Sequence, residues 1–140
     1  MIAAMVKYLL LLILLSVNVL AGELASFTTD GCSVVADGTY EAKRLWKSCC
    51  VTHDYAYWQG GTSEQRRTAD AELRSCIVNL GKKRTAALMH FGVRLGGSPY
   101  FPSAYRWGYG WPYYRGYGEL SLEELEQVQE KLELVRKSQN

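Results

Sequence analysis

Residues that can perform acid–base chemistry are concentrated between Trp46 and Gly61, in the segment WKSCCVTHDYAYWQGG. Cys49, His53 and Tyr57 follow one another at intervals of four residues, so on a helix they lie on one face. A histidine can remove a proton from water if a carboxylate holds its ring in the right tautomer. The segment therefore predicts a hydrolytic site on a helix, provided that an acidic residue faces His53.

Two helices are expected to position this site. The stretch from residue 40 to residue 58 contains no Pro or Gly, and the turn sequence QGGT follows it. Thr62 and Gln65 then have the spacing of a capping box, and Gly81 is placed to end the second helix. Because the turn is short, the two helices are expected to be antiparallel neighbours.

The register of such a helical hairpin brings an acidic residue to His53. Facing residues in an antiparallel pair have position numbers with a nearly constant sum. Cys49 then faces Cys76, and His53 faces Asp70 at a neighbouring level. We therefore expect Asp70 to orient the His53 ring, and we expect the Tyr57 hydroxyl to steady Asp70.

The rest of the chain predicts further helices and one irregular segment. A short helix is expected from residue 84 to residue 93, ended by Gly96 and Gly97. Residues 98–118 are rich in aromatic residues, Gly and Pro, and are not expected to form regular structure. The predicted fold class is all-α, with a helical core at residues 22–97 that is stapled by disulfides.

A last amphipathic helix is expected within residues 119–140, where Ser121 and Glu124 have the spacing of a capping box. Its apolar residues are spaced 3, 4 and 3 apart: Leu125, Val128, Leu132 and Val135. This narrow stripe predicts packing on the domain, with a homodimer through the helix as the alternative.

The first 21 residues are typical of a secretory signal peptide. Lys7 precedes the apolar run YLLLLILLSVNVLA, and Val19 and Ala21 are placed as in a small-residue cleavage site. We therefore expect a secreted or periplasmic protein, cleaved near Ala21; an uncleaved anchor is the alternative. The formal net charge of +2 argues against nucleic acid as the main partner.

The four cysteines Cys32, Cys49, Cys50 and Cys76 all lie after the predicted signal peptide. An even number in an oxidising compartment predicts two disulfides. Adjacent cysteines rarely bridge each other, which leaves two of the three pairings open. A zinc site made of Cys49, Cys50, Cys76 and His53 is the alternative.

A cation site is expected beside His53. The side chain of Asp54 points about 100° away from that of His53 around the helix, towards Cys50. If Cys50 bonds Cys32, the loop of residues 30–38 lies against Asp54. A carboxylate facing backbone carbonyls suits calcium, which would polarise a substrate carbonyl.

These residues resemble a known family. CCVTHDYAY is similar to the CCxxHDxCY active-site helix of secreted phospholipases A2, and ADAELRSC is similar to their second long helix. The resemblance covers roughly residues 30–80. It implies that His53 is the general base, that Asp54 binds calcium, that Asp70 orients His53, and that Tyr57 bonds Asp70.

The resemblance also implies a calcium loop and a disulfide pairing. Backbone carbonyls of Gly31, Ser33 and Val35 would be the remaining protein ligands, although Ser33 and Val35 stand where the family has glycines. The family pairing corresponds to Cys49–Cys76 and Cys32–Cys50.

Two departures from the family pattern are informative. Ala56 and Ala69 replace two cysteines that bond each other in the family, so both partners of one bridge are missing together. The two helices are joined by only a few residues, without the strand pair that many relatives insert. A shorter, bacterial-type or otherwise divergent member of the superfamily would have both features.

The expected function is calcium-assisted hydrolysis of a phospholipid ester, at the sn-2 position by the resemblance, on a phospholipid membrane surface. Trp107 and Trp111 in the aromatic segment are expected at the lipid interface, where such rings are favoured. The alternative for these rings is that they wrap the helical core. The alternative for the whole chain is a non-catalytic module that binds lipid or protein.

Overall fold

The computed structural model describes residues 22–138, which contain four α-helices and no strand. The helices are α2 (Lys47–Gln59), α3 (Ser63–Asn79), α4 (Lys83–Gly96) and α5 (Leu122–Ser138). The predicted all-α class is therefore confirmed for this part of the chain, whereas the predicted signal peptide lies outside the described residues. Among the helices of residues 22–138, none combines the length and the hydropathy that crossing a membrane requires.

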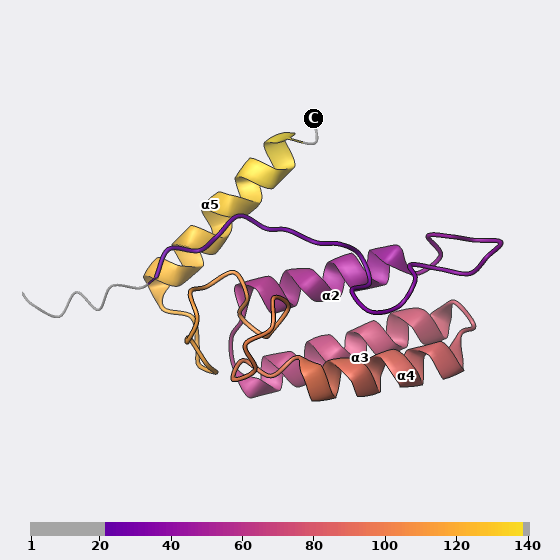
Figure 1. Cartoon of the computed structure of the whole chain (residues 1–140). Helices are drawn as coiled ribbons and strands as arrows, with labels where there is room; N and C mark the ends of the chain where they lie inside the picture. The colour runs from indigo at the N-terminus through magenta and orange to yellow at the C-terminus, as the bar shows by residue number, and fades with distance from the viewer. Residues whose placement is uncertain (1–21, 139–140) are drawn as a thin grey trace, which may run out of the picture.

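Helices α2, α3 and α4 lie side by side, each antiparallel to the next, and α5 lies apart at one end (Figure 1). The predicted capping box of α3 is present, since the Thr62 hydroxyl accepts from Gln65 N and the Gln65 side chain accepts from Thr62 N. Gly60 and Gly61 both have positive φ in the turn before α3, which explains how so short a connection reverses the chain.

The first predicted helix begins seven residues later than expected. Residues 40–46 form turns because the loop before α2 binds back on the helix start. Trp46 N donates to Asp37 O, and the Trp46 indole donates to Ala36 O at 2.7 Å. Lys47 forms an ion pair with Asp37. The third helix is longer than expected and runs through Gly96.

Both disulfides are present, and the pairing implied by the family resemblance is confirmed. Cys32 bonds Cys50, and Cys49 bonds Cys76. The first bond ties the loop before α2 to that helix, and the second joins α2 to α3. None of the four cysteines is free, so the alternative of a zinc site with thiolate ligands is wrong.

The segment after residue 21 and the aromatic segment form a second core against α2 and α5. Leu24 and Trp58 are fully buried there, and Trp111 and Val128 pack with them. The Trp58 indole donates to Ala25 O at 2.8 Å. Val128 and Leu132 belong to the predicted apolar stripe of α5, so this part of the stripe faces the domain, whereas Leu125 is 42% exposed. A homodimer through α5 stays a prediction.

Candidate active site

The structure brings the predicted histidine, aspartate and tyrosine together between α2 and α3. His53 Nε2 lies 2.8 Å from Asp70 Oδ1, and the Tyr57 hydroxyl lies 2.7 Å from the same oxygen. His53 and Tyr57 are on adjacent turns of α2, and their rings pack with centroids 4.2 Å apart. Asp70 has no exposed surface. The helical hairpin therefore has the register that the sequence predicted.

The direction of each hydrogen bond follows from Arg66, one turn before Asp70 on α3. Arg66 Nε donates to the Tyr57 oxygen at 3.0 Å, and a guanidinium can only donate. The Tyr57 hydroxyl therefore accepts from Arg66 and donates its own proton to Asp70. Since an ionised Asp70 can only accept, His53 carries its proton on Nε2, which leaves Nδ1 as the basic nitrogen.

Asp70 is ionised despite its burial. Burial alone would raise the pKa of Asp70, but hydrogen bonds from His53, Arg94 and Tyr57 together hold it below its usual value. The pKa of Tyr57 is raised well above its usual range, first by burial and then by the negative charge of Asp70. Tyr57 therefore stays protonated and acts as a fixed hydrogen-bond donor.

Two arginines of this site were not predicted from the sequence. Arg94 at the end of α4 donates from Nη1 to Asp70 Oδ2 at 2.6 Å. Arg66 is almost completely buried and also donates to Tyr117 and to the backbone of α4. The spacing of Arg66, four residues before Asp70, was a usable signal. No signal pointed to Arg94, because the packing register of α4 was not predicted.

His53 and Asp54 both line an open cleft of about 690 Å³ between α2, α4 and the loop before α2. Its walls are mostly apolar and include Leu73, Met89 and Val93. A smaller cavity of about 180 Å³ lies between α2 and α3. Its lining residues include Ala56 and Ala69, which stand where secreted phospholipases A2 have two cysteines.

Asp54 is a buried carboxylate that forms no ion pair with a basic side chain of the described residues. Its Oδ2 accepts from the Thr29 hydroxyl at 2.6 Å, and within residues 22–138 no basic nitrogen lies within 4 Å of it. Burial raises the pKa of Asp54 to about 6, although the hydrogen bond from Thr29 lowers it. A negative charge in this position is costly and would be stabilised by a bound cation.

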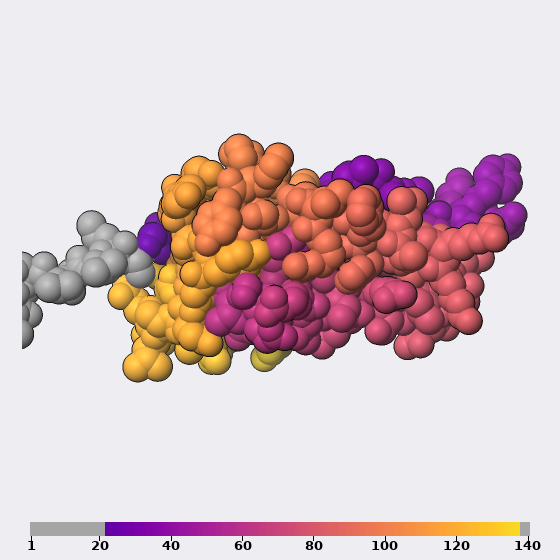
Figure 2. Space-filling view, turned by 90° about the horizontal axis from the view of Figure 1, so that it is seen from below, coloured from indigo at the N-terminus to yellow at the C-terminus, as the bar shows by residue number. Residues whose placement is uncertain are grey.

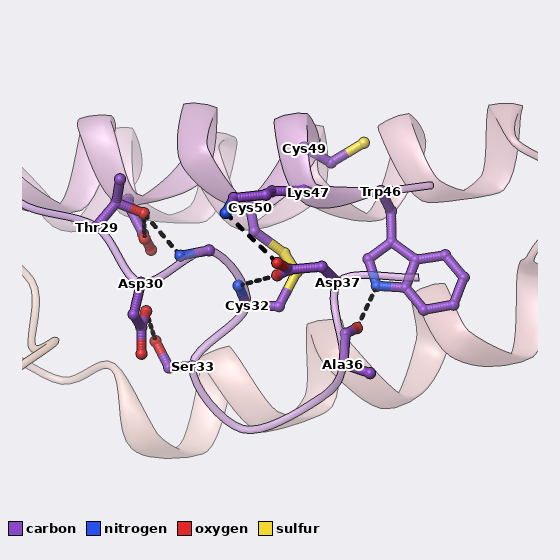
Figure 3. Close-up of a disulfide and its surroundings, with 12 residues drawn as sticks. Thr29, Asp30, Cys32, Ser33, Ala36, Asp37, Trp46, Lys47, Cys49 and Cys50 are labelled. Carbon is purple, nitrogen blue, oxygen red and sulfur yellow. Dashed lines mark hydrogen bonds and ion pairs between the residues drawn. A yellow bond between two sulfur atoms is a disulfide. The ribbon is translucent and has the colours of Figure 1, made fainter. Parts of the chain in front are cut away.

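The loop before α2, which the Cys32–Cys50 disulfide ties to that helix (Figure 3), lines the same cleft as Asp54 and offers backbone carbonyls as hard oxygen ligands. Among residues 22–138, no N–H or O–H group donates to the backbone carbonyls of Gly31, Ser33 or Val35. The same part of the chain has no cluster of three His, Cys, Asp or Glu side chains suited to a metal. A cation at this site would therefore depend on Asp54 and these carbonyls, which are donors of the kind that calcium prefers.

The shape of this loop requires glycine at Gly31 and at Gly38, where a Cβ would collide with the backbone of Ala42 and Leu45. Gly31 has a φ of 83°, and a Cβ there would collide with the carboxylate of Asp37, which accepts from Cys32 N. No residue other than glycine has a positive φ among residues 22–138, so Ser33 and Val35 have ordinary backbone conformations. The loop therefore forms without glycine at these two positions, where secreted phospholipases A2 have it.

The two tryptophans predicted at a lipid interface are buried, so that prediction is wrong. Trp107 and Trp111 are 2% and 3% exposed. The Trp107 indole donates to Gly61 O and its ring packs edge-on against Tyr57. The Trp111 indole donates to Gln59 O. Both rings wrap the end of α2, as the alternative interpretation of the aromatic segment predicted.

Comparisons with known proteins leave this geometry as the main basis for assigning a function. No family model, no curated protein and no solved structure matches the chain.

Proposed function

We propose that the chain is a phospholipase A2-like hydrolase, which uses water activated by His53 to cleave a phospholipid ester, at the sn-2 position by the family resemblance. One observation carries the proposal. His53 is held through Nε2 by a buried, ionised Asp70, and it lines the same apolar cleft as Asp54, a buried carboxylate with no cationic partner within residues 22–138. A base, a cation site and an apolar cleft are the parts that this reaction needs.

In the proposed reaction, His53 Nδ1 accepts a proton from water while the water oxygen forms a bond to the ester carbonyl carbon. The carbonyl electron pair moves onto its oxygen and returns when the bond to the glycerol oxygen breaks. His53 then gives its proton to the departing glycerol oxygen. The products are a fatty acid and a lysophospholipid, and the base contributes roughly 10²–10⁴-fold in rate.

Asp54 and the carbonyls of Gly31, Ser33 and Val35 are the residues that would hold calcium. When bound, calcium would supply positive charge that polarises the substrate carbonyl. Asp54 must be ionised to serve as a ligand, so metal affinity is expected to increase as the pH rises through about 6.

Exposed apolar side chains around the cleft support a lipid surface as the partner. On α4, Leu88, Phe91 and Leu95 are spaced 3 and 4 residues apart and are 64%, 61% and 64% exposed. Val34 and Phe101 are also exposed, and both line the cleft together with Leu88 and Leu95. In Figure 2 the surface of α4 adjoins that of the loop before α2. Contiguous apolar surface of this kind marks membrane or protein contacts.

The test is fatty-acid release from vesicles of mixed zwitterionic and anionic phospholipid, with calcium and then with excess chelator. Asp54→Asn serves as the matched variant, because an Asn oxygen can still accept from Thr29 while its charge is gone. We expect release that requires both calcium and Asp54. Release that is unaffected by chelator and by the substitution would remove calcium from the mechanism.

The same assay addresses the non-catalytic alternative. Vesicles are recovered by flotation, and bound protein is measured beside free fatty acid. Binding without any release, from a folded chain with both disulfides, would contradict the proposed hydrolase. It would instead favour a lipid-binding module that keeps the helix pair.

A further inference from the structure

Arg94 occupies the oxygen of Asp70 that His53 and Tyr57 leave free. His53 and Tyr57 both bond Oδ1, whereas Arg94 Nη1 donates to Oδ2 at 2.6 Å. His53 and Tyr57 belong to α2, Asp70 to α3 and Arg94 to α4. Three helices therefore meet at one fully buried carboxylate.

No other side chain among residues 22–138 makes this hydrogen bond. Arg66 Nε lies 3.9 Å from Asp70 Oδ2, beyond hydrogen-bond distance, and donates to the Tyr57 hydroxyl. A hydrogen bond between a guanidinium and a carboxylate is roughly twice as strong as one between neutral groups. Without Arg94, Oδ2 would be buried without a donor, and the carboxylate would be free to turn about its broad side-chain torsion.

The backbone from which the Arg94 side chain extends is held in place by Arg66. Arg66 Nη2 donates to Val93 O at 2.9 Å and to Arg94 O at 3.0 Å, so it holds the backbone at the end of α4. The Arg94 side chain is about a third exposed, and it reaches from this anchored turn to a carboxylate with no exposed surface. The contact is thus part of the packed site and differs from a mobile surface ion pair.

We propose that Arg94 is a positioning residue, which holds Asp70 Oδ2 so that Oδ1 stays aimed at His53 Nε2 and the His53 ring keeps its orientation at the cleft. The effect on catalysis rests on the proposed hydrolase function. The effect on the His53–Asp70 hydrogen bond does not, and it can be measured without turnover.

The experiment compares Arg94→Gln, Arg94→Lys and Arg94→Ala with Arg74→Gln. Arg74 is an exposed residue on α3, one turn after Asp70, and it has no partner among residues 22–138. For vesicle hydrolysis we expect Arg94→Gln to lower kcat by about 10-fold, with KM within about twofold, because ground-state lipid binding is not involved. Arg94→Lys should keep a higher kcat than Arg94→Gln, and added methylguanidinium should partly restore the kcat of Arg94→Ala. Arg74→Gln should have the kcat and KM of the wild type.

A second readout is the proton NMR signal of His53 Nε2–H. In the wild type we expect a slowly exchanging, downfield resonance, and in Arg94→Gln we expect it to shift or broaden while circular dichroism stays unchanged. An Arg94→Gln protein with wild-type kcat and an unchanged His53 signal would overturn the proposal. If the wild type does not hydrolyse phospholipid at all, the proposed function fails, and the NMR signal alone decides the role of Arg94.

The wild-type protein also provides a test in case the variants do not fold. In nitrogen-detected NMR spectra, rotation of the Arg94 guanidinium NH₂ groups should be slow, because Nη1 donates a hydrogen bond to a buried carboxylate. The same rotation in Arg74 should be fast. Equally fast rotation in both side chains would contradict the contact on which the proposal is built.

Discussion

Replacing Asp54 by Asn should stabilise the calcium-free protein at neutral pH. The substitution removes a buried charge and keeps an oxygen that can accept from the Thr29 hydroxyl. Raising the pKa of Asp54 from 3.8 to about 6 corresponds to about 3 kcal/mol at 1.36 kcal/mol per pH unit. Because Asp54 lines an open cleft, solvent screening reduces the expected gain to about 1–2 kcal/mol, or about 4–8 °C in Tm.

The pH range of this effect follows from its sign. The pKa of Asp54 is higher in the folded protein than in the unfolded chain, so its stabilising contribution is present below pH 3.8 and is lost as the pH rises through about 6. The difference between wild type and Asp54→Asn should therefore be small near pH 4 and reach its full size above pH 7. Asp70 titrates in both proteins, so its opposite pH dependence cancels in the comparison.

The assay is urea unfolding in chelator between pH 4 and pH 8, followed by the same titration with calcium. At a calcium concentration of about 100 times Kd, the wild type should gain about 2.7 kcal/mol, and Asp54→Asn should gain much less. An Asn variant that is less stable than the wild type at pH 8, or a difference that does not vary with pH, would refute the idea of an uncompensated buried charge.

Two further substitutions test the site and its surroundings. Gly97→Ala should lower the free energy of unfolding by about 1–3 kcal/mol and lower kcat, because the added Cβ would lie 2.6 Å from Tyr57 Cε1 and push the tyrosine away from Asp70. Thermal unfolding and vesicle hydrolysis measure the two effects, and wild-type values in both assays would contradict this packing. Phe91→Asp should weaken vesicle binding and leave the hydrolysis of a monomeric short-chain ester unchanged. Leu134 is also exposed but lies on α5, so Leu134→Asp should leave vesicle binding unchanged. Equal losses of binding by the two variants in flotation assays would exclude α4 as the specific lipid contact.

The helical hairpin and its His53–Asp70 pair were predictable because both depend on local rules. Helix spacing puts His53 and Tyr57 on one face, and the short turn fixes the register that brings Asp70 opposite. The capping box at Thr62 set the start of α3 correctly. The disulfide pairing needed the family resemblance, since the spacing of the cysteines left two pairings open.

The features that the sequence did not predict depend on packing between distant segments. Trp111 packs with Leu24 and Val128, which lie near opposite ends of the described chain, and this burial has no local signal. The start of α2 shifted because Asp37 binds Trp46 and Lys47 across a loop. The contact between α4 and Asp70 likewise depends on how α4 packs on α3, which helical periodicity alone does not specify.

The most direct test of the central claim is the release of an sn-2-labelled acyl chain from phospholipid vesicles in calcium, compared between wild type and His53→Gln. The glutamine amide can still donate to Asp70, so the variant keeps that hydrogen bond but has no base. We predict release by the wild type and a loss of at least about 100-fold in a folded His53→Gln protein. Comparable release by the two proteins would contradict the assignment of His53 as the base that activates water.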